Sequence, residues 1–217
     1  NNDKENKRQN EDGENETYYG GFDALQHNGN TVQNGDLMLL ASTAYGESSE
    51  KNVSNEVYGI ASAIVNNMDL RKNGTIQGTI KGFAFAATDG NKRTKEFNNT
   101  SEGGRNGTFM QTAIGGAINA LSGGIDYSNG ATHWAGTDIA SSTEKRATGG
   151  LLFSDQSHDM FCLGSQTANG APVKGYNRDG SYRGTYSYTW QTTAAFGGTT
   201  FMKKTDKFII ATGAPRY

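Results

Sequence analysis

The chain has 217 residues, enough for one domain with a core of its own or for one domain with an extension. Its net charge of -2 lacks the basic excess of a duplex-binding domain, so we expect no nucleic-acid partner. No apolar run approaches the roughly 20 residues needed to cross a bilayer, so we expect no membrane insertion. The single cysteine, Cys162, excludes an intramolecular disulfide and argues against a thiolate zinc site.

The first segment, residues 1–20, is charged, rich in amides and almost free of aliphatic side chains. Such a segment buries too little apolar surface to offset its ordering entropy, so we predict a polar tail or linker. Residues 21–217 are then expected to form one folded domain. The chain begins with Asn1, so we expect a processed product or a piece of a longer protein, and the lack of a visible export signal carries little weight.

Three segments have apolar residues at helical spacing, namely 36–47, 54–68 and 108–122. Asp36 is a candidate cap for the first helix, and Ser54 for the second. The third helix contains Gly115 and Gly116, which lower helix propensity, so another element is expected to approach closely there.

The remaining segments are more varied. Residues 74–85 fit a short helix or an extended segment, and 89–107 are predicted to be a long polar loop. Extended segments or strands are predicted at 131–134, 180–188, 198–202 and 207–212. Helices come first along the chain and strands later, which is typical of the α+β class.

Glu47, at the end of the first predicted helix, is the most informative polar residue. On a helical wheel it lies about 20° from Leu40, so it points toward the apolar face. A carboxyl group in that position needs a hydrogen bond, a charged partner or a proton. Glycoside cleavage requires such a carboxyl as its general acid. The alternative is that the helix end frays and turns Glu47 outward, or that Glu47 caps the next helix.

Four motifs occur in order along the chain: LASTAYGESSEKNVSNEVYGIASAIVNN at 40–67, AINALSGG at 117–124, GATHW at 130–134 and FGGTTF at 196–201. Together they resemble the bacterial cell wall hydrolases typified by spore cortex-lytic enzymes. The resemblance implies a lysozyme-like fold in residues 21–217, peptidoglycan glycan strands as the substrate, and lytic transglycosylase or muramidase activity. It also implies that Glu47 is the catalytic acid.

The chain departs from the family pattern at several places. The family's central Gln-Phe pair is replaced near Ala84 and Phe85, and the histidine of its closing strand is replaced by Thr199 and Thr200. An insertion at about 141–185 separates GATHW from the last strands. These departures leave the catalytic acid intact and affect the expected substrate contacts.

The mechanism depends on whether a second carboxylate is available. Two-carboxylate glycosidases need a partner roughly 5–10 Å from the acid, whereas a lytic transglycosylase needs one acid alone. Glu50 and Glu56 are the nearest candidates in sequence, but a solvated loop explains the first and a helix start explains the second. Asp126 and Asp138 could act from across a cleft, although surface turns also explain them. We favour the single-acid mechanism.

A sugar cleft should be lined by aromatic and polar groups, because pyranose faces are apolar and their hydroxyls need partners. The predicted substrate-binding residues are Tyr45, Phe85, Tyr127, His133 and Trp134. Trp134 fits the core equally well. Asn66 is assigned a structural role at the end of its helix. The three histidines, His27, His133 and His158, are far apart in sequence, so neither a metal site nor a cofactor is expected.

Two other classes of function remain open. The chain could be a non-catalytic carbohydrate-binding or structural module of a secretion or injection machine, or a peptidoglycan amidase acting on the peptide stems. A wall-cleaving enzyme must be exported, so the expected location is the periplasm or cell wall. The polar tail and the insertion also fit a part of a larger chain or of an injection assembly.

Overall fold

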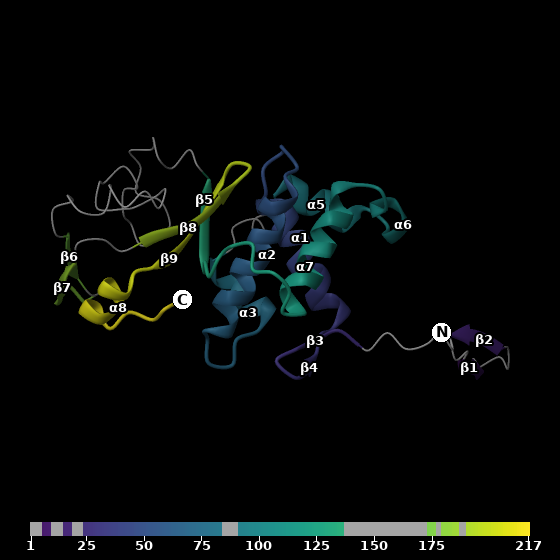
Figure 1. The fold of residues 1–217 in the computed structure, drawn as a ribbon, viewed down its shortest axis with the longest axis horizontal. Helices are drawn as coiled ribbons and strands as arrows, with labels where there is room; N and C mark the ends of the chain where they lie inside the picture. The colour runs from purple at the N-terminus through teal and green to yellow at the C-terminus, as the bar shows by residue number, and fades with distance from the viewer. Residues whose placement is uncertain are drawn as a thin grey trace.

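The computed structural model describes residues 6–9, 15–18, 24–83, 91–136, 173–176, 179–186 and 190–217. Within this part of the chain, helices form the larger body and short antiparallel strands form small sheets, which agrees with the α+β class (Figure 1). None of the helices in these residues is long and apolar enough to cross a membrane.

Three helices form the centre of the body: α1 (Asn34–Glu47), α2 (Ser54–Asp69) and α7 (Phe109–Leu121). Each was predicted from its apolar spacing, and the structure confirms all three. Helix α1 begins at Asn34, however, so Asp36 lies in its first turn and is not its cap. Shorter helices pack around them: α3 (Ile76–Phe83), α5 (Lys92–Asn99) and α6 (Glu102–Arg105).

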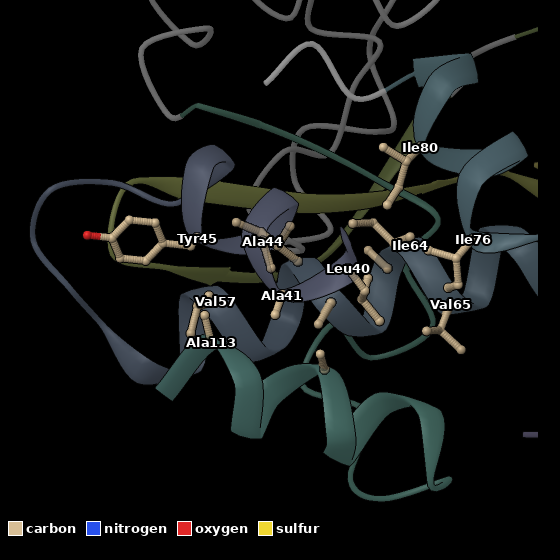
Figure 2. Close-up of a cluster of buried hydrophobic side chains, with 14 of the residues drawn as sticks. Leu40, Ala41, Ala44, Tyr45, Val57, Ile64, Val65, Ile76, Ile80 and Ala113 are labelled. Atoms are coloured by element: carbon tan, nitrogen blue, oxygen red, sulfur yellow. The ribbon is translucent and has the colours of Figure 1, made fainter. Parts of the chain in front are cut away.

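The core lies between these helices and is made mostly of small and branched side chains. In Figure 2, Leu40, Ala41 and Ala44 lie along α1, and Val57 of α2 faces Ala113 of α7. Small residues let the helix axes approach closely, and this allows the packing density of a native interior. The same cluster reaches from α1 to Phe201 near the end of the chain, so the N-terminal helices and a C-terminal strand share one core.

The main sheet has three antiparallel strands in the order β5-β9-β8, which are β5 (His133–Gly136), β9 (Thr199–Lys204) and β8 (Trp190–Phe196). Phe201 of β9 is fully buried and packs against Gly59 of α2, where an added Cβ would come within 2.6 Å of the ring. Gly59 therefore lets the sheet lie directly on α2, and Figure 1 shows β5 beside that helix.

The remaining elements are short. Three hairpins pair β1 (Asn6–Gln9) with β2 (Asn15–Tyr18), β3 (Gln26–His27) with β4 (Asn30–Thr31), and β6 (Val173–Tyr176) with β7 (Tyr182–Tyr186). Helix α8 (Asp206–Thr212) follows the sheet and packs on β7. The segment predicted to be a polar tail thus contains a paired hairpin, which Figure 1 shows away from the helices.

Several local predictions differ from the structure. Residues 89–107 contain α5 and α6 rather than one loop, because Asn91 and Ser101 cap these helices with their side chains. The strand predicted at 207–212 is part of α8, which Thr205 caps and Gly213 ends in a left-handed conformation. Helix α2 is preceded by Val53, so Ser54 is its first residue and not its cap. Most of the insertion at 141–185 lies outside the described residues.

Candidate active site

Glu47 is the last residue of α1, and its side chain is half-buried. The indole Nε1 of Trp134 donates a long hydrogen bond of 3.4 Å to Glu47 Oε2. Trp134 comes from β5, which lies against α2 beside the end of α1. The structure therefore brings together the predicted acid and one predicted substrate-binding aromatic, 87 residues apart in sequence.

The backbone that carries Glu47 is fixed by helix α5. The Nε of Arg93 donates to the carbonyl of Tyr45 at 3.0 Å, and Asn91 donates to the carbonyl of Gly46 at 3.1 Å. Both carbonyls belong to the last turn of α1, which has no helical partner for them. A second Arg93 nitrogen binds Asn52 Oδ1 at 3.0 Å. Arg93 thus joins the end of α1 to the loop that follows Glu47.

Tyr45 supports the site from inside. Its side chain is 6% exposed, and its ring packs against Phe97 and Phe109. The Arg93 guanidinium lies 4.1 Å from the ring centroid, and the hydroxyl donates to Glu96 Oε2 at 3.3 Å. Burial raises the pKa of Tyr45 above its ordinary value, and Glu96 acts in the same direction against the lowering effect of Arg93. The sequence predicted a substrate contact here, but the exposed area of this side chain is very small.

His133 and Trp134 are neighbours in β5 and therefore point to opposite faces of the sheet. Trp134 is paired with Phe201 on the face that covers the helices. His133 packs edge-on against Trp190, with 4.7 Å between ring centroids, and its Nδ1 is 2.9 Å from Thr132 Oγ1. His133 therefore lies on the face of β5 opposite to the one that carries Trp134 and its contact with Glu47.

The environment of His133 keeps its imidazole neutral. Burial is the largest effect, and the positive charges of Lys204 and Arg71 add to it, so the pKa of His133 falls to about 3. The half-buried ring packs against Trp190. The role of His133 in substrate binding stays a prediction.

Tyr127 and Asn66 both contribute to the contact between α2 and the segment that precedes β5. The Tyr127 ring is half-buried and packs edge-on against Tyr58 at 5.1 Å. Asn66 donates to Asp126 Oδ2 at 3.0 Å and to the carbonyl of Ala131 at 3.0 Å. It therefore ties α2 to the turn that precedes β5, which agrees with the structural role predicted for it.

Asp126 is committed to the same turn. Its carboxylate accepts hydrogen bonds from the Ser128 backbone, the Ser128 hydroxyl, the Gly130 backbone and Asn66. Burial raises the pKa of Asp126, but these hydrogen bonds outweigh it and hold the pKa below its ordinary value. Asp126 is thus a turn residue, as one of the two interpretations of the sequence had it.

The two carboxylates that follow Glu47 in the sequence, Glu50 and Glu56, differ in their exposure to solvent. Glu50 is exposed on the loop after α1. Glu56 is fully buried, and accepts hydrogen bonds from Ser49 Oγ at 2.6 Å and Thr199 Oγ1 at 2.7 Å. The sequence offered Glu56 as a candidate second carboxylate and favoured a role at the helix start. Its partners could not be found from spacing, because Thr199 is 143 residues away.

Among the described residues, hollows lie around His27 and Asp69. Their volumes are about 350 Å³ and about 300 Å³, and neither is lined by Glu47. His27 Nε2 is 2.7 Å from Asp69 Oδ1, and its Nδ1 is 2.9 Å from the carbonyl of Leu121. These contacts fasten the β3–β4 hairpin to the ends of α2 and α7.

Some predicted residues lie outside the described part of the chain, namely Phe85, Asp138, His158 and Cys162. Among the residues that the structure does describe, no group of three or more His, Cys, Asp or Glu side chains is placed to hold a metal ion.

Comparisons with known proteins found no match: no family model fits the chain, and neither a curated protein nor a solved structure is significantly similar to it. The likeness to the cortex-lytic family therefore rests on the four sequence motifs alone.

Proposed function

We propose that this protein cleaves the glycan strands of peptidoglycan and that Glu47 is its proton donor. The observation that carries the proposal is the contact between Glu47 and Trp134. The half-buried carboxyl group of Glu47 supplies a proton donor, and the indole beside it supplies an apolar surface for a sugar ring. The order of the four motifs supports the same function, and the helical body with its small sheet is compatible with a lysozyme-like fold.

Trp134 would also determine which oxygen of Glu47 carries the proton. The carbonyl oxygen of a carboxylic acid is a stronger hydrogen-bond acceptor than its hydroxyl oxygen, so the indole N–H favours Oε2 as the carbonyl oxygen of the acid. The proton then resides on Oε1. In this arrangement Oε1 donates the proton to the glycosidic oxygen while the bond from that oxygen to the sugar C1 breaks.

The surrounding carboxylates favour the single-acid mechanism. Within the described residues, Glu50 is exposed, Glu56 is buried and doubly hydrogen-bonded, and Asp126 accepts four hydrogen bonds in its turn. Glu56 and Asp126 are engaged by these donors and Glu50 faces solvent, so we assign none of the three as a second carboxylate. Asp138, the remaining candidate from the sequence, lies outside the described residues. In the proposed reaction the sugar's own C6 hydroxyl attacks C1, its proton passes to the Glu47 carboxylate, and the product is an anhydro sugar. The substrate implies action in the periplasm or cell wall.

The direct test compares two glutamines on purified sacculi. Glu47→Gln keeps the shape of the side chain and removes the transferable proton, so we expect turbidity clearing to fall at least about 100-fold. Glu50→Gln, three residues along on the exposed loop, is the matched control and should clear like the wild type. Equal clearing by wild type and Glu47→Gln would refute the proposal.

Two other outcomes would assign a different function. Binding to sacculi without release of soluble fragments would indicate a carbohydrate-binding module. Release of free peptide stems with intact glycan would indicate an amidase.

A further inference from the structure

Glu56 is a buried carboxylate that the proposed chemistry does not use. Its side chain is fully buried in the first turn of α2, and both of its oxygens are occupied. Ser49 Oγ donates to Oε2 at 2.6 Å, and Thr199 Oγ1 donates to Oε1 at 2.7 Å. A buried carboxylate is costly unless such donors satisfy it, so this position requires a specific arrangement of three separate segments.

The turn between β8 and β9 closes over the same carboxylate. Gly197 in this turn has a φ of +66°, and a Cβ there would clash with Glu56. The carbonyl of Gly197 accepts a hydrogen bond from Lys51 Nζ at 2.9 Å. Only glycine fits both the backbone conformation and the space, so turn and carboxylate are packed as one unit.

The two donors to Glu56 lie on either side of the Glu47–Trp134 contact. Ser49 follows Glu47 by two residues, on the loop that begins at the end of α1. Thr199 begins β9, the strand that pairs with β5, with Thr199 opposite Gly136 and Phe201 opposite Trp134. The bonds of Glu56 therefore connect the backbone that carries the acid to the sheet that carries the indole.

We propose that Glu56 is a positioning residue that sets the distance between Glu47 and Trp134 by holding Ser49 and Thr199 together. This inference rests on the proposed function for its effect on rate. Glu56 is fully buried and touches no substrate in this role. It acts through the two segments that it joins, and loss of either donor should loosen the acid relative to the indole.

The test uses two adjacent threonines of β9. Thr199→Val removes the hydroxyl that binds Glu56 and keeps the shape of the side chain. Thr200→Val is the matched control, because Thr200 Oγ1 is buried and has no hydrogen-bond partner among the described residues. We expect Thr199→Val to lower kcat on soluble glycan chains roughly 10- to 100-fold, with KM within about twofold. Thr200→Val should keep both values, and Thr199→Ser should restore the rate.

A second readout does not depend on activity. The indole N–H proton of Trp134, assigned by its loss in Trp134→Phe, reports the contact with Glu47 in an NMR spectrum. It should shift in Thr199→Val and in Glu56→Gln, and stay in place in Thr200→Val. If wild type cleaves glycan but both threonine variants keep its rate and its indole resonance, the positioning role is refuted while the proposed function stands. If wild type cleaves nothing, the proposed function fails. The positioning role is then judged by NMR alone, and it is refuted if the indole resonance shifts in both valine variants or in neither.

Discussion

Trp134 is the residue whose contact with Glu47 defines the candidate site. Its indole donates across 3.4 Å, which is long for a hydrogen bond, so its strength lies at the lower end of bonds to carboxyl groups. The helical wheel predicts that Glu47 lies close to Leu40, because an α-helix has 3.6 residues per turn. In the structure Glu47 is half-buried at the end of α1. Sequence reasoning could not separate Trp134 from His133, because their faces depend on the register of β5.

Trp134→Phe tests this contact. The phenyl ring keeps an apolar surface and loses the donor. The carboxylate that develops as Glu47 gives up its proton should therefore lose about 1 kcal/mol of stabilisation, with roughly a fivefold lower kcat. Steady-state rates on soluble glycan chains measure the effect. Trp190→Phe, on the opposite face of the sheet, should lower the melting temperature without changing the rate of the folded protein. A full wild-type rate in Trp134→Phe would contradict a role for this donor.

His133 predicts a specific pH dependence of stability. The folded pKa of about 3 lies below the ordinary value of 6.5. Between these values the unfolded chain binds a proton that the folded chain does not bind, so stability is lost as the pH falls from 6.5 toward 3. The loss should reach about 2–4 kcal/mol. The lowered pKa of Asp126 acts in a separate window, below its ordinary value of 3.8.

Urea unfolding at pH 7, 5.5 and 4.5 measures this loss. In His133→Phe the aromatic ring remains against Trp190 and the titrating group is absent, so the free energy of unfolding should change much less over this range. Parallel curves for wild type and His133→Phe would contradict a neutral His133 in the folded protein.

At the scale of elements, long helices rich in apolar residues were predictable and short polar ones were not. Helices α2 and α7 each have an apolar stripe that the core requires, and α1 is buried on all sides from Leu40 to Gly46. Helix α5 buries only Thr94 and Phe97, so its sequence resembles a loop. The apolar run in α8 is too short for its period to separate helix from strand, and the Thr205 cap decides between them.

The close approach predicted at Gly115 and Gly116 is present, and Tyr58 of α2 fills it. A Cβ on Gly116 would lie 3.3 Å from the Tyr58 Cα, whereas a Cβ on Gly115 would meet the tip of the Tyr58 side chain, with the hydroxyl nearest at 2.8 Å. The Tyr58 hydroxyl is at the end of a flexible side chain and can move away from an added Cβ. The Tyr58 Cα belongs to the backbone of a packed helix and cannot.

Alanine at these two positions should therefore have opposite effects. Gly115→Ala should stabilise the protein by up to about 1 kcal/mol through helix propensity, and Gly116→Ala should destabilise it by about 1–3 kcal/mol through overpacking. Thermal unfolding of the two variants measures the difference. Equal melting temperatures would contradict the packing of α2 on α7.

At the scale of the whole molecule, one core joins the N-terminal helices to a strand near the C-terminus, and the candidate site lies where they meet. Sequence spacing could predict each side of this junction but not the contacts across it. Arg93, Glu56 and Thr199 connect segments far apart in the chain, and only the folded arrangement shows that they act on the same loop.

The central claim is that Glu47 donates a proton in glycan cleavage without a second carboxylate. Mass spectrometry of the fragments that the wild type releases from purified sacculi tests it most directly, with Glu47→Gln as the control. We predict anhydromuramyl ends from the wild type and no fragments from the variant. Reducing ends would contradict the single-acid mechanism, and the same fragments from Glu47→Gln would contradict the assignment of the acid.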